Sequence, residues 1–139
     1  MEFVNKQLAF KLKEKGFDKP CMNAMNKFGC TYLNGWCEYL DERDYDCILF
    51  ITQSDLKEGD CLLPTIDQVL KWLREEKDID IVIYPIDRNT IYMGGEKYIL
   101  SIYFCGKRDY KIHKDNNDKF VKWEDACIAG IEYVINNLI

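Results

Sequence analysis

The sequence is short of the residues and motifs on which most catalytic sites depend. Its 139 residues include one histidine, His113, and its seven cysteines form no C-x-x-C pair. The phosphate-loop pattern G-x-x-x-x-G-K-[ST], the dinucleotide pattern G-x-G-x-x-G and the hydrolase pattern G-x-S-x-G are all absent. These absences remove the main support for zinc, nucleotide-cofactor and hydrolase chemistry, so we expect neither a bound metal nor a cofactor.

The sequence also lacks the segments that direct a chain into or across a membrane. No window approaches the roughly 18 continuous apolar residues of a spanning helix. Residues 1–6 have no basic region leading into an apolar run, as a secretory signal would. Without an export signal the cysteines are expected to be reduced thiols, and we expect a cytoplasmic protein.

A net positive charge is absent as well. The chain carries 24 acidic and 19 basic side chains, which gives a net charge of −5. This sign argues against binding to duplex nucleic acid, because such binding depends on neutralising phosphates with lysine and arginine. Apolar residues make up 47% of the chain and charged residues 31%, as in an ordinary globular protein, and the length predicts one domain over residues 1–139.

What the sequence does have is one strongly patterned segment, residues 63–76, that predicts a helix. Thr65 followed by Gln68 is typical of a capping box, in which each side chain hydrogen-bonds the backbone N–H of the other residue. A strand at residues 79–86 is predicted to follow, because β-branched residues dominate it. The apolar face of the helix is predicted to comprise Ile66, Val69, Leu70 and Leu73, with Trp72 at its flank.

Two further helices are predicted near the ends of the chain. The first covers residues 5–15, with Gly16 placed for a left-handed exit and Phe17 for a contact back onto the helix. The last covers residues 122–137. Its mid-helix Gly130 indicates close packing against another element, and its wide apolar face requires either the sheet or a second subunit.

These helices and the strands between them predict an α+β fold, a single domain in which a mostly antiparallel sheet is packed by three helices in the order α-β-β-α-β-β-β-α. Turn signals at Asn34-Gly35 and Gly94-Gly95 predict hairpins. The other predicted strands are 28–33, 36–40 or alternatively 46–52, 90–93 and 97–105, and residues 106–119 are predicted to form a surface loop. The predicted core comprises Leu12, Phe17, Leu70, Leu73, Ile81, Ile83, Leu100, Ile102, Ile131 and Val134.

The acidic and aromatic stretch between Tyr32 and Asp46 is the first candidate functional surface. Its carboxylates lack the spacing and the glycine of a calcium loop, so a solvated loop is the simplest interpretation. A more specific interpretation is that the carboxylates imitate a nucleic-acid backbone for a basic partner protein. The candidate partner-binding residues are Tyr32, Trp36, Tyr39, Asp41, Glu42, Asp44 and Tyr45.

Three arginines, Arg74, Arg88 and Arg108, form the second candidate. Each is predicted at an element end or in a loop, where a guanidinium group can clamp a phosphate or carboxylate. Ordinary surface arginines are the alternative interpretation. A few arginines with a stacked tyrosine or tryptophan would bind a small anionic ligand such as a nucleotide. A cysteine beside His113 with a lowered thiol pKa would instead indicate an enzyme.

Three groups of segments span most of the chain. They are KLKEKGF (11–17), then LPT (63–65) with VLKWLREE (69–76) and IDI (79–81), and finally WEDA (123–126) with GIE (130–132). Together and in this order they resemble small uncharacterised proteins common in phages and prophages of the Bacteroidetes. Residues 18–62 have least in common with that pattern. The resemblance implies a mobile element as the genetic setting, in which small acidic proteins often bind host or defence components, and it implies no catalytic residue.

The leading functional hypothesis is therefore a non-enzymatic phage accessory protein that binds a host or defence protein through the stretch between Tyr32 and Asp46. An anti-defence role is one version of it. A sequestering binder of a small anionic ligand is the second hypothesis, and a cysteine-dependent or metal-dependent enzyme is the third. A homodimer is an open alternative alongside all three.

Overall fold

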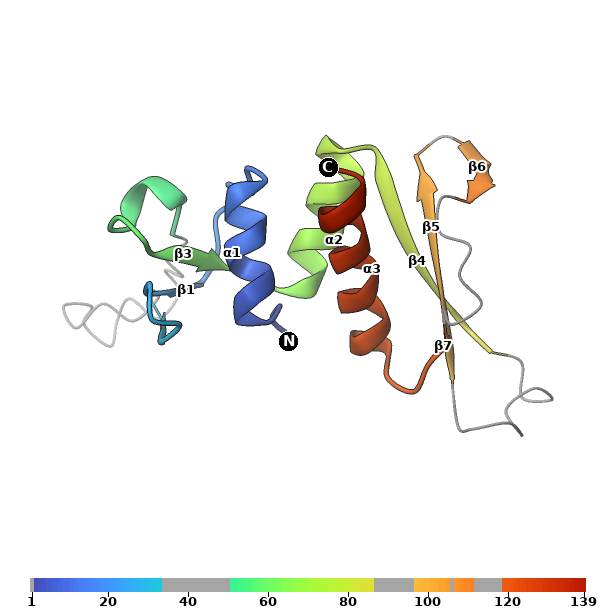
Figure 1. The fold of residues 1–139 in the computed structure, drawn as a ribbon, viewed down its shortest axis with the longest axis horizontal. Helices are drawn as coiled ribbons and strands as arrows, with labels where there is room; N and C mark the ends of the chain where they lie inside the picture. Colours follow the sequence, from blue (N-terminus) through green and yellow to red (C-terminus); the bar gives the residue numbers. More distant parts are fainter. Residues whose placement is uncertain (1, 34–50, 87–96, 106, 112–118) are drawn as a thin grey trace, which may run out of the picture. The chain divides into compact units, whose positions relative to one another are not determined.

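The computed structural model describes residues 2–33, 51–86, 97–105, 107–111 and 119–139 (Figure 1). These residues form the helices α1 (Lys6–Glu14), α2 (Ile66–Glu76) and α3 (Trp123–Asn137), and a short 3-10 helix, η2 (Gln53–Asp55). None of these helices is long and apolar enough to cross a membrane. The strands are β1 (Asn23–Met25), β2 (Thr31–Leu33), β3 (Cys61–Leu63), β4 (Ile79–Pro85), β5 (Tyr98–Phe104), β6 (Lys107–Lys111) and β7 (Lys119–Phe120).

The α+β class predicted from the sequence is confirmed, with one correction to the sheet. Within the described residues the strands form two antiparallel sheets, where the sequence predicts one. The first has the order β2-β1-β3, and the second has the order β4-β5-β6, with β7 also paired to β5. Each strand pairs within its own half of the chain, which divides into two compact units, Met1–Gln68 and Val69–Ile139.

Helix α1 begins and ends close to where the sequence predicts. The Asn5 side chain accepts a hydrogen bond from Leu8 N at 2.8 Å. At the other end, Gly16 has a φ of 87°, and Phe17 N donates to Leu12 O at 2.9 Å. This backbone bond, made across a left-handed glycine, is the Schellman ending, and it directs the Phe17 side chain into the core, where it is buried.

The first sheet corrects the predicted N-terminal hairpin. Strand β1 pairs with β2 through Ala24 and Tyr32, and with β3 through Ala24 and Leu62. Strand β2 is therefore shorter than the predicted strand 28–33, and its partner precedes it in the sequence. The predicted return strand 36–40 and its Asn34-Gly35 turn lie outside the described residues.

The alternative strand at 46–52 is described only at its end. There Ile51 forms a single antiparallel bridge with Cys21, through two backbone hydrogen bonds of 2.9 and 2.7 Å. Both residues are fully buried in the first unit. An isolated bridge needs only one matched pair of residues, so it leaves no periodic signal in the sequence.

Helix α2 carries the predicted capping box. Thr65 N donates to Gln68 Oε1 at 3.0 Å, and Gln68 N donates to Thr65 Oγ1 at 3.2 Å. The predicted apolar face is wrong in one respect, because Trp72 is 1% exposed whereas Leu70 is only half-buried. An indole ring has more apolar surface to remove from water than a leucine side chain, and its N–H is satisfied by Glu76 Oε2 at 3.1 Å.

In the second unit, α3 packs on one face of the ladder that β4 and β5 form along their whole length (Figure 1). The packing is closest at Gly130. A Cβ atom built on this glycine would lie 2.8 Å from Ile81 Cγ2 and 2.9 Å from Leu100 Cδ1. The close packing predicted from Gly130 is therefore confirmed, and its cause is that two core side chains occupy the space of a side chain at this position.

The predicted core is largely confirmed. Its buried members are Leu12, Phe17, Leu73, Ile81, Leu100, Ile102, Ile131 and Val134, each at most 7% exposed. Leu70 and Ile83 are half-buried instead. Leu70 gives way to Trp72 on α2, and Ile83 lies near the end of β4, beside the exposed Tyr84 and Pro85.

The predicted surface loop at residues 106–119 is wrong in part. Lys107–Lys111 forms β6, which pairs with β5 across a register shift between Tyr103 and Phe104, and Lys119 begins β7. The charged residues of β6 show no alternation, so only the pairing with β5 identifies this strand. The predicted strand 90–93 and the Gly94-Gly95 turn lie outside the described residues.

Gly130→Ala is expected to destabilise the protein. Overpacking of a core by one methyl group typically costs about 1–3 kcal/mol of stability. This cost exceeds the roughly 1 kcal/mol by which alanine stabilises a helix relative to glycine. Urea denaturation measures the free energy of unfolding. In a Leu100→Ala background, which empties the space beside the new Cβ, the same substitution should cost less. A more stable Gly130→Ala protein would contradict the contact.

Candidate functional site

The second unit has a pocket of about 470 Å³ on the face of the sheet that points away from α3. Side chains alternate along a strand, so Asp80, Val82 and Tyr84 lie on the face opposite Ile81, which contacts α3. We call the hollow that they line the sheet-face pocket. Its other lining residues are Arg74 from the last turn of α2, and Tyr103, Phe104 and Cys105 from β5 and its end.

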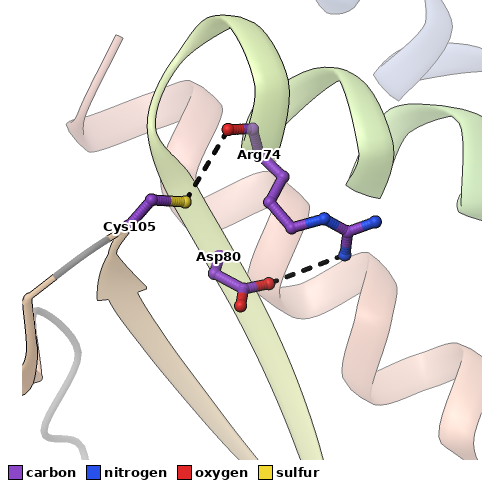
Figure 2. Close-up of polar contacts among 3 residues, drawn as sticks. All are labelled: Arg74, Asp80 and Cys105. Carbon is purple, nitrogen blue, oxygen red and sulfur yellow. Dashed lines mark hydrogen bonds and ion pairs between the residues drawn. The ribbon is translucent and has the colours of Figure 1, made fainter.

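Figure 2 shows a charged pair, Arg74 and Asp80, that belongs to the lining of the sheet-face pocket. Arg74 Nη1 lies 3.7 Å from Asp80 Oδ1, and the two side chains are 50% and 33% exposed. Water screens a pair of this exposure, so it contributes little to stability. Its main effect is on the charge of the pocket, because the Asp80 carboxylate offsets the positive charge that Arg74 would present to an anion.

Cys105 lies beside this pair, and its thiol donates to the backbone carbonyl oxygen of Arg74 at 3.7 Å (Figure 2). Burial raises the pKa of the Cys105 thiol, and the negative charges of Asp80 and Asp78 raise it further, while Arg74 acts in the opposite direction. A thiol that keeps its proton is a poor nucleophile. The pocket therefore presents aromatic rings and an ion pair, and not a reactive thiolate.

The structure places one of the three predicted anion-binding arginines in the pocket. Arg74 lines it, as described above. Arg108 belongs to β6, and the structure describes its backbone but not its side chain. Arg88 lies outside the described residues. Sequence reasoning missed the aromatic lining of the pocket, because Tyr84 and Tyr103 share one face of the sheet only through the pairing of β4 with β5.

Of the predicted partner-binding residues, the structure describes one. Tyr32 lies in β2, paired with Ala24 of β1. The remaining members of this set lie outside the described residues, so their role stays a prediction. They are Trp36, Tyr39, Asp41, Glu42, Asp44 and Tyr45.

The first unit presents an exposed aromatic side chain just before this stretch. Residues 26–30, which we call the Phe28 turn, join β1 to β2. Asn26 Oδ1 accepts hydrogen bonds from Phe28 N at 2.9 Å and from Cys30 N at 3.0 Å, and Gly29 has a φ of 81°. These contacts hold the turn while the Phe28 side chain remains 79% exposed. An asparagine followed three residues later by glycine is a signal for such a turn, and the predicted strand 28–33 is wrong at residues 28–30.

A second hollow, of about 540 Å³, lies between the Phe28 turn and residues 55–60. Asp60 Oδ1 accepts from Lys27 N at 3.2 Å and so joins the two segments. The Lys27 ammonium lies 5.2 Å from the centre of the Phe28 ring. Hydrogen bonds from Thr52 lower the pKa of Asp55, which keeps this carboxylate ionised at the rim. The surface around Phe28 therefore carries charges of both signs.

The described residues assemble no metal site or activated thiol. No group of three or more His, Cys, Asp or Glu side chains among them could hold a metal ion. Burial raises the pKa of Cys21 to about 12 and that of Cys61 to about 11. His113 lies outside the described residues, so a cysteine–histidine pair stays a prediction.

Comparison of the chain with models of protein families, with curated proteins and with solved structures finds no match. The sheet-face pocket and the Phe28 turn are the two candidate surfaces that the described residues themselves provide.

Alkylation of the native protein with iodoacetamide should modify Cys30 before Cys21 and Cys61. Cys30 is exposed, whereas the other two are buried and their raised pKa values keep the thiols protonated at mildly alkaline pH. Peptide mass spectrometry after a short reaction measures the modification at each site. Reaction in urea is the control, because all three thiols are then accessible. Fast modification of Cys61 in the native protein would contradict its burial.

Proposed function

We propose that this chain is a non-enzymatic accessory protein of a phage or other mobile element, which acts in the cytoplasm of its bacterial host by binding a host or defence protein. The observation that carries the proposal is the exposure of Phe28 on a hydrogen-bonded turn. An aromatic side chain on an ordered backbone loses little freedom on binding, and such side chains dominate the energetics of protein interfaces.

The sequence that follows the Phe28 turn supports the same proposal. Strand β2 leads from the turn into the acidic and aromatic stretch that ends at Asp46. A partner that fits this surface has an apolar hollow for Phe28 and basic groups beside it. The net charge of −5 favours encounter with such a basic partner. The raised pKa values of Cys21, Cys61 and Cys105 also favour a binding role over thiol catalysis.

Quantitative co-purification from a Bacteroidetes host tests this proposal. Phe28→Ala and the triple substitution Asp41→Asn, Glu42→Gln and Asp44→Asn should each reduce recovery of the partner by roughly tenfold or more, because each removes a central contact of the interface. Mass spectrometry with isotope labelling measures the ratio of partner to bait for every variant.

The matched control neutralises three exposed acids elsewhere, by Glu14→Gln, Asp125→Asn and Glu132→Gln. It changes the net charge by the same amount and should leave recovery unchanged. Equal recovery with the wild-type chain, Phe28→Ala and the first triple variant would refute partner binding through this surface. Equal loss with both triple variants would show that only the net charge matters.

The sheet-face pocket supports a second candidate, a binder that sequesters a small anionic ligand such as a nucleotide. The observation in its favour is the combination of one guanidinium group with aromatic rings, which together can hold a phosphate and a stacked base. It ranks second because Asp80 already offsets the charge of Arg74. An incoming phosphate would have to compete with that carboxylate.

Calorimetric titration with a panel of nucleoside mono- and triphosphates tests the second candidate. Arg74→Gln should abolish binding, and Asp80→Asn should strengthen it, because the substitution leaves the guanidinium group without a competing carboxylate. Lys71→Gln, an exposed charge change on the same helix, is the control and should have no effect. Absence of binding by wild type and Asp80→Asn alike would exclude this candidate for the panel.

A further inference from the structure

Strand β4 is an edge strand of its sheet in the part of the chain that the structure describes. Two hydrogen bonds just beyond its ends define which of its backbone groups face β5. Cys105 N donates to Asp78 O at 2.7 Å, and Ile86 N donates to Lys97 O at 2.8 Å. The ladder between these bonds is regular, and hydrogen-bonded pairs alternate with non-bonded pairs in an antiparallel ladder.

The alternation assigns the backbone of β4 to two sides. The two bonds are made by Asp78 and Ile86, and every second residue between them has the same orientation. The N–H and C=O groups of Asp80, Val82 and Tyr84 therefore point toward β5. Ile79, Ile81 and Ile83 therefore direct theirs away from β5, along the outer edge of the strand, where Ile79 and Ile81 are 2% and 7% exposed and Ile83 is half-buried. No hydrogen bond from these edge-facing groups is made within the described residues.

The sequence of β4 does not protect this edge in the usual ways. Exposed edges are commonly blocked by lysine, by a bulge or by a proline within the strand. Strand β4 has no lysine, its one charged residue, Asp80, is paired with Arg74, its pairing with β5 has no bulge, and Pro85 stands only at its last position. A long β-branched edge of this kind is a template for another strand.

We propose that β4 pairs with β4 of a second copy of this chain, in antiparallel orientation across a twofold axis at Val82. Val82 is the middle residue of Ile79–Pro85, so a twofold axis at this residue pairs the full length of β4 with the full length of β4 in the second copy. Ile81 then lies opposite Ile83 of the second copy, and the two residues exchange both backbone hydrogen bonds. Pro85 has no N–H to donate, but it falls at the end of the new ladder, where one missing hydrogen bond costs least.

The side chains of β4 suit this symmetric pairing. On the outer face, Asp80 lies opposite Tyr84 of the second copy, so no carboxylate faces a carboxylate. On the inner face, the isoleucines of the two copies meet and extend the apolar surface that α3 covers. This interface differs from a dimer through α3, because Ile131 and Val134 of that helix are already fully buried in one chain. It is also independent of the proposed host partner.

Analytical ultracentrifugation over a range of protein concentrations tests the inference. The wild-type chain should sediment as a dimer at high concentration. Val82→Lys and Val82→Glu should each be monomeric, because two like charges then face each other at the axis. An equimolar mixture of the two variants should dimerise again, because lysine then faces glutamate. Val82→Thr, a neutral β-branched substitution, is the control and should dimerise like the wild type.

A wild-type chain that stays monomeric at every concentration would overturn the inference, and so would a Val82→Lys chain that dimerises as well as the wild type. Amide hydrogen exchange of the wild type gives an answer even where the charged variants do not fold. Raising the concentration should slow exchange at the Ile81 and Ile83 amides and leave the Val82 amide, which faces β5, unchanged. Exchange at Ile81 and Ile83 that does not depend on concentration would overturn it equally.

Discussion

The contact of Gly130 with Ile81 and Leu100 is the constraint on which the second unit depends. With no side chain at position 130, α3 approaches β4 and β5 closely enough to bury Ile131 and Val134 completely. A helix held this close covers the part of the two-strand ladder that carries Ile81 and Leu100. Asp80, Val82, Tyr84 and Tyr103 lie on the other face, where they line the sheet-face pocket.

The same ladder supports the binding role that we propose. Its outer face combines aromatic rings with an ion pair whose charges offset each other, and its one thiol has a raised pKa. The Phe28 turn of the first unit supports the same proposal, because hydrogen bonds to the Asn26 side chain hold the turn while Phe28 stays exposed. Aromatic side chains are enriched at protein interfaces, which is why these surfaces support the proposal.

Features with a local physical cause were predictable from the sequence. The Asn5 cap, the glycine ending of α1 and the capping box at Thr65 each depend on residues within one helical turn, and all three are confirmed. Features that depend on pairing between distant residues were not predictable. The three-residue strand β1 is defined only by its partners β2 and β3, and the lining of the sheet-face pocket only by the register that places Asp80 opposite Tyr103.

Native mass spectrometry of the chain purified from its host, recorded before and after mild denaturation, tests the central claim that this protein works by binding another protein. One spectrum reports the number of subunits, any bound metal and any retained small molecule. We expect a complex that releases a host protein on denaturation and carries no nucleotide-sized mass. A chain that releases a nucleotide-sized molecule or a metal ion, with no protein partner, would contradict it.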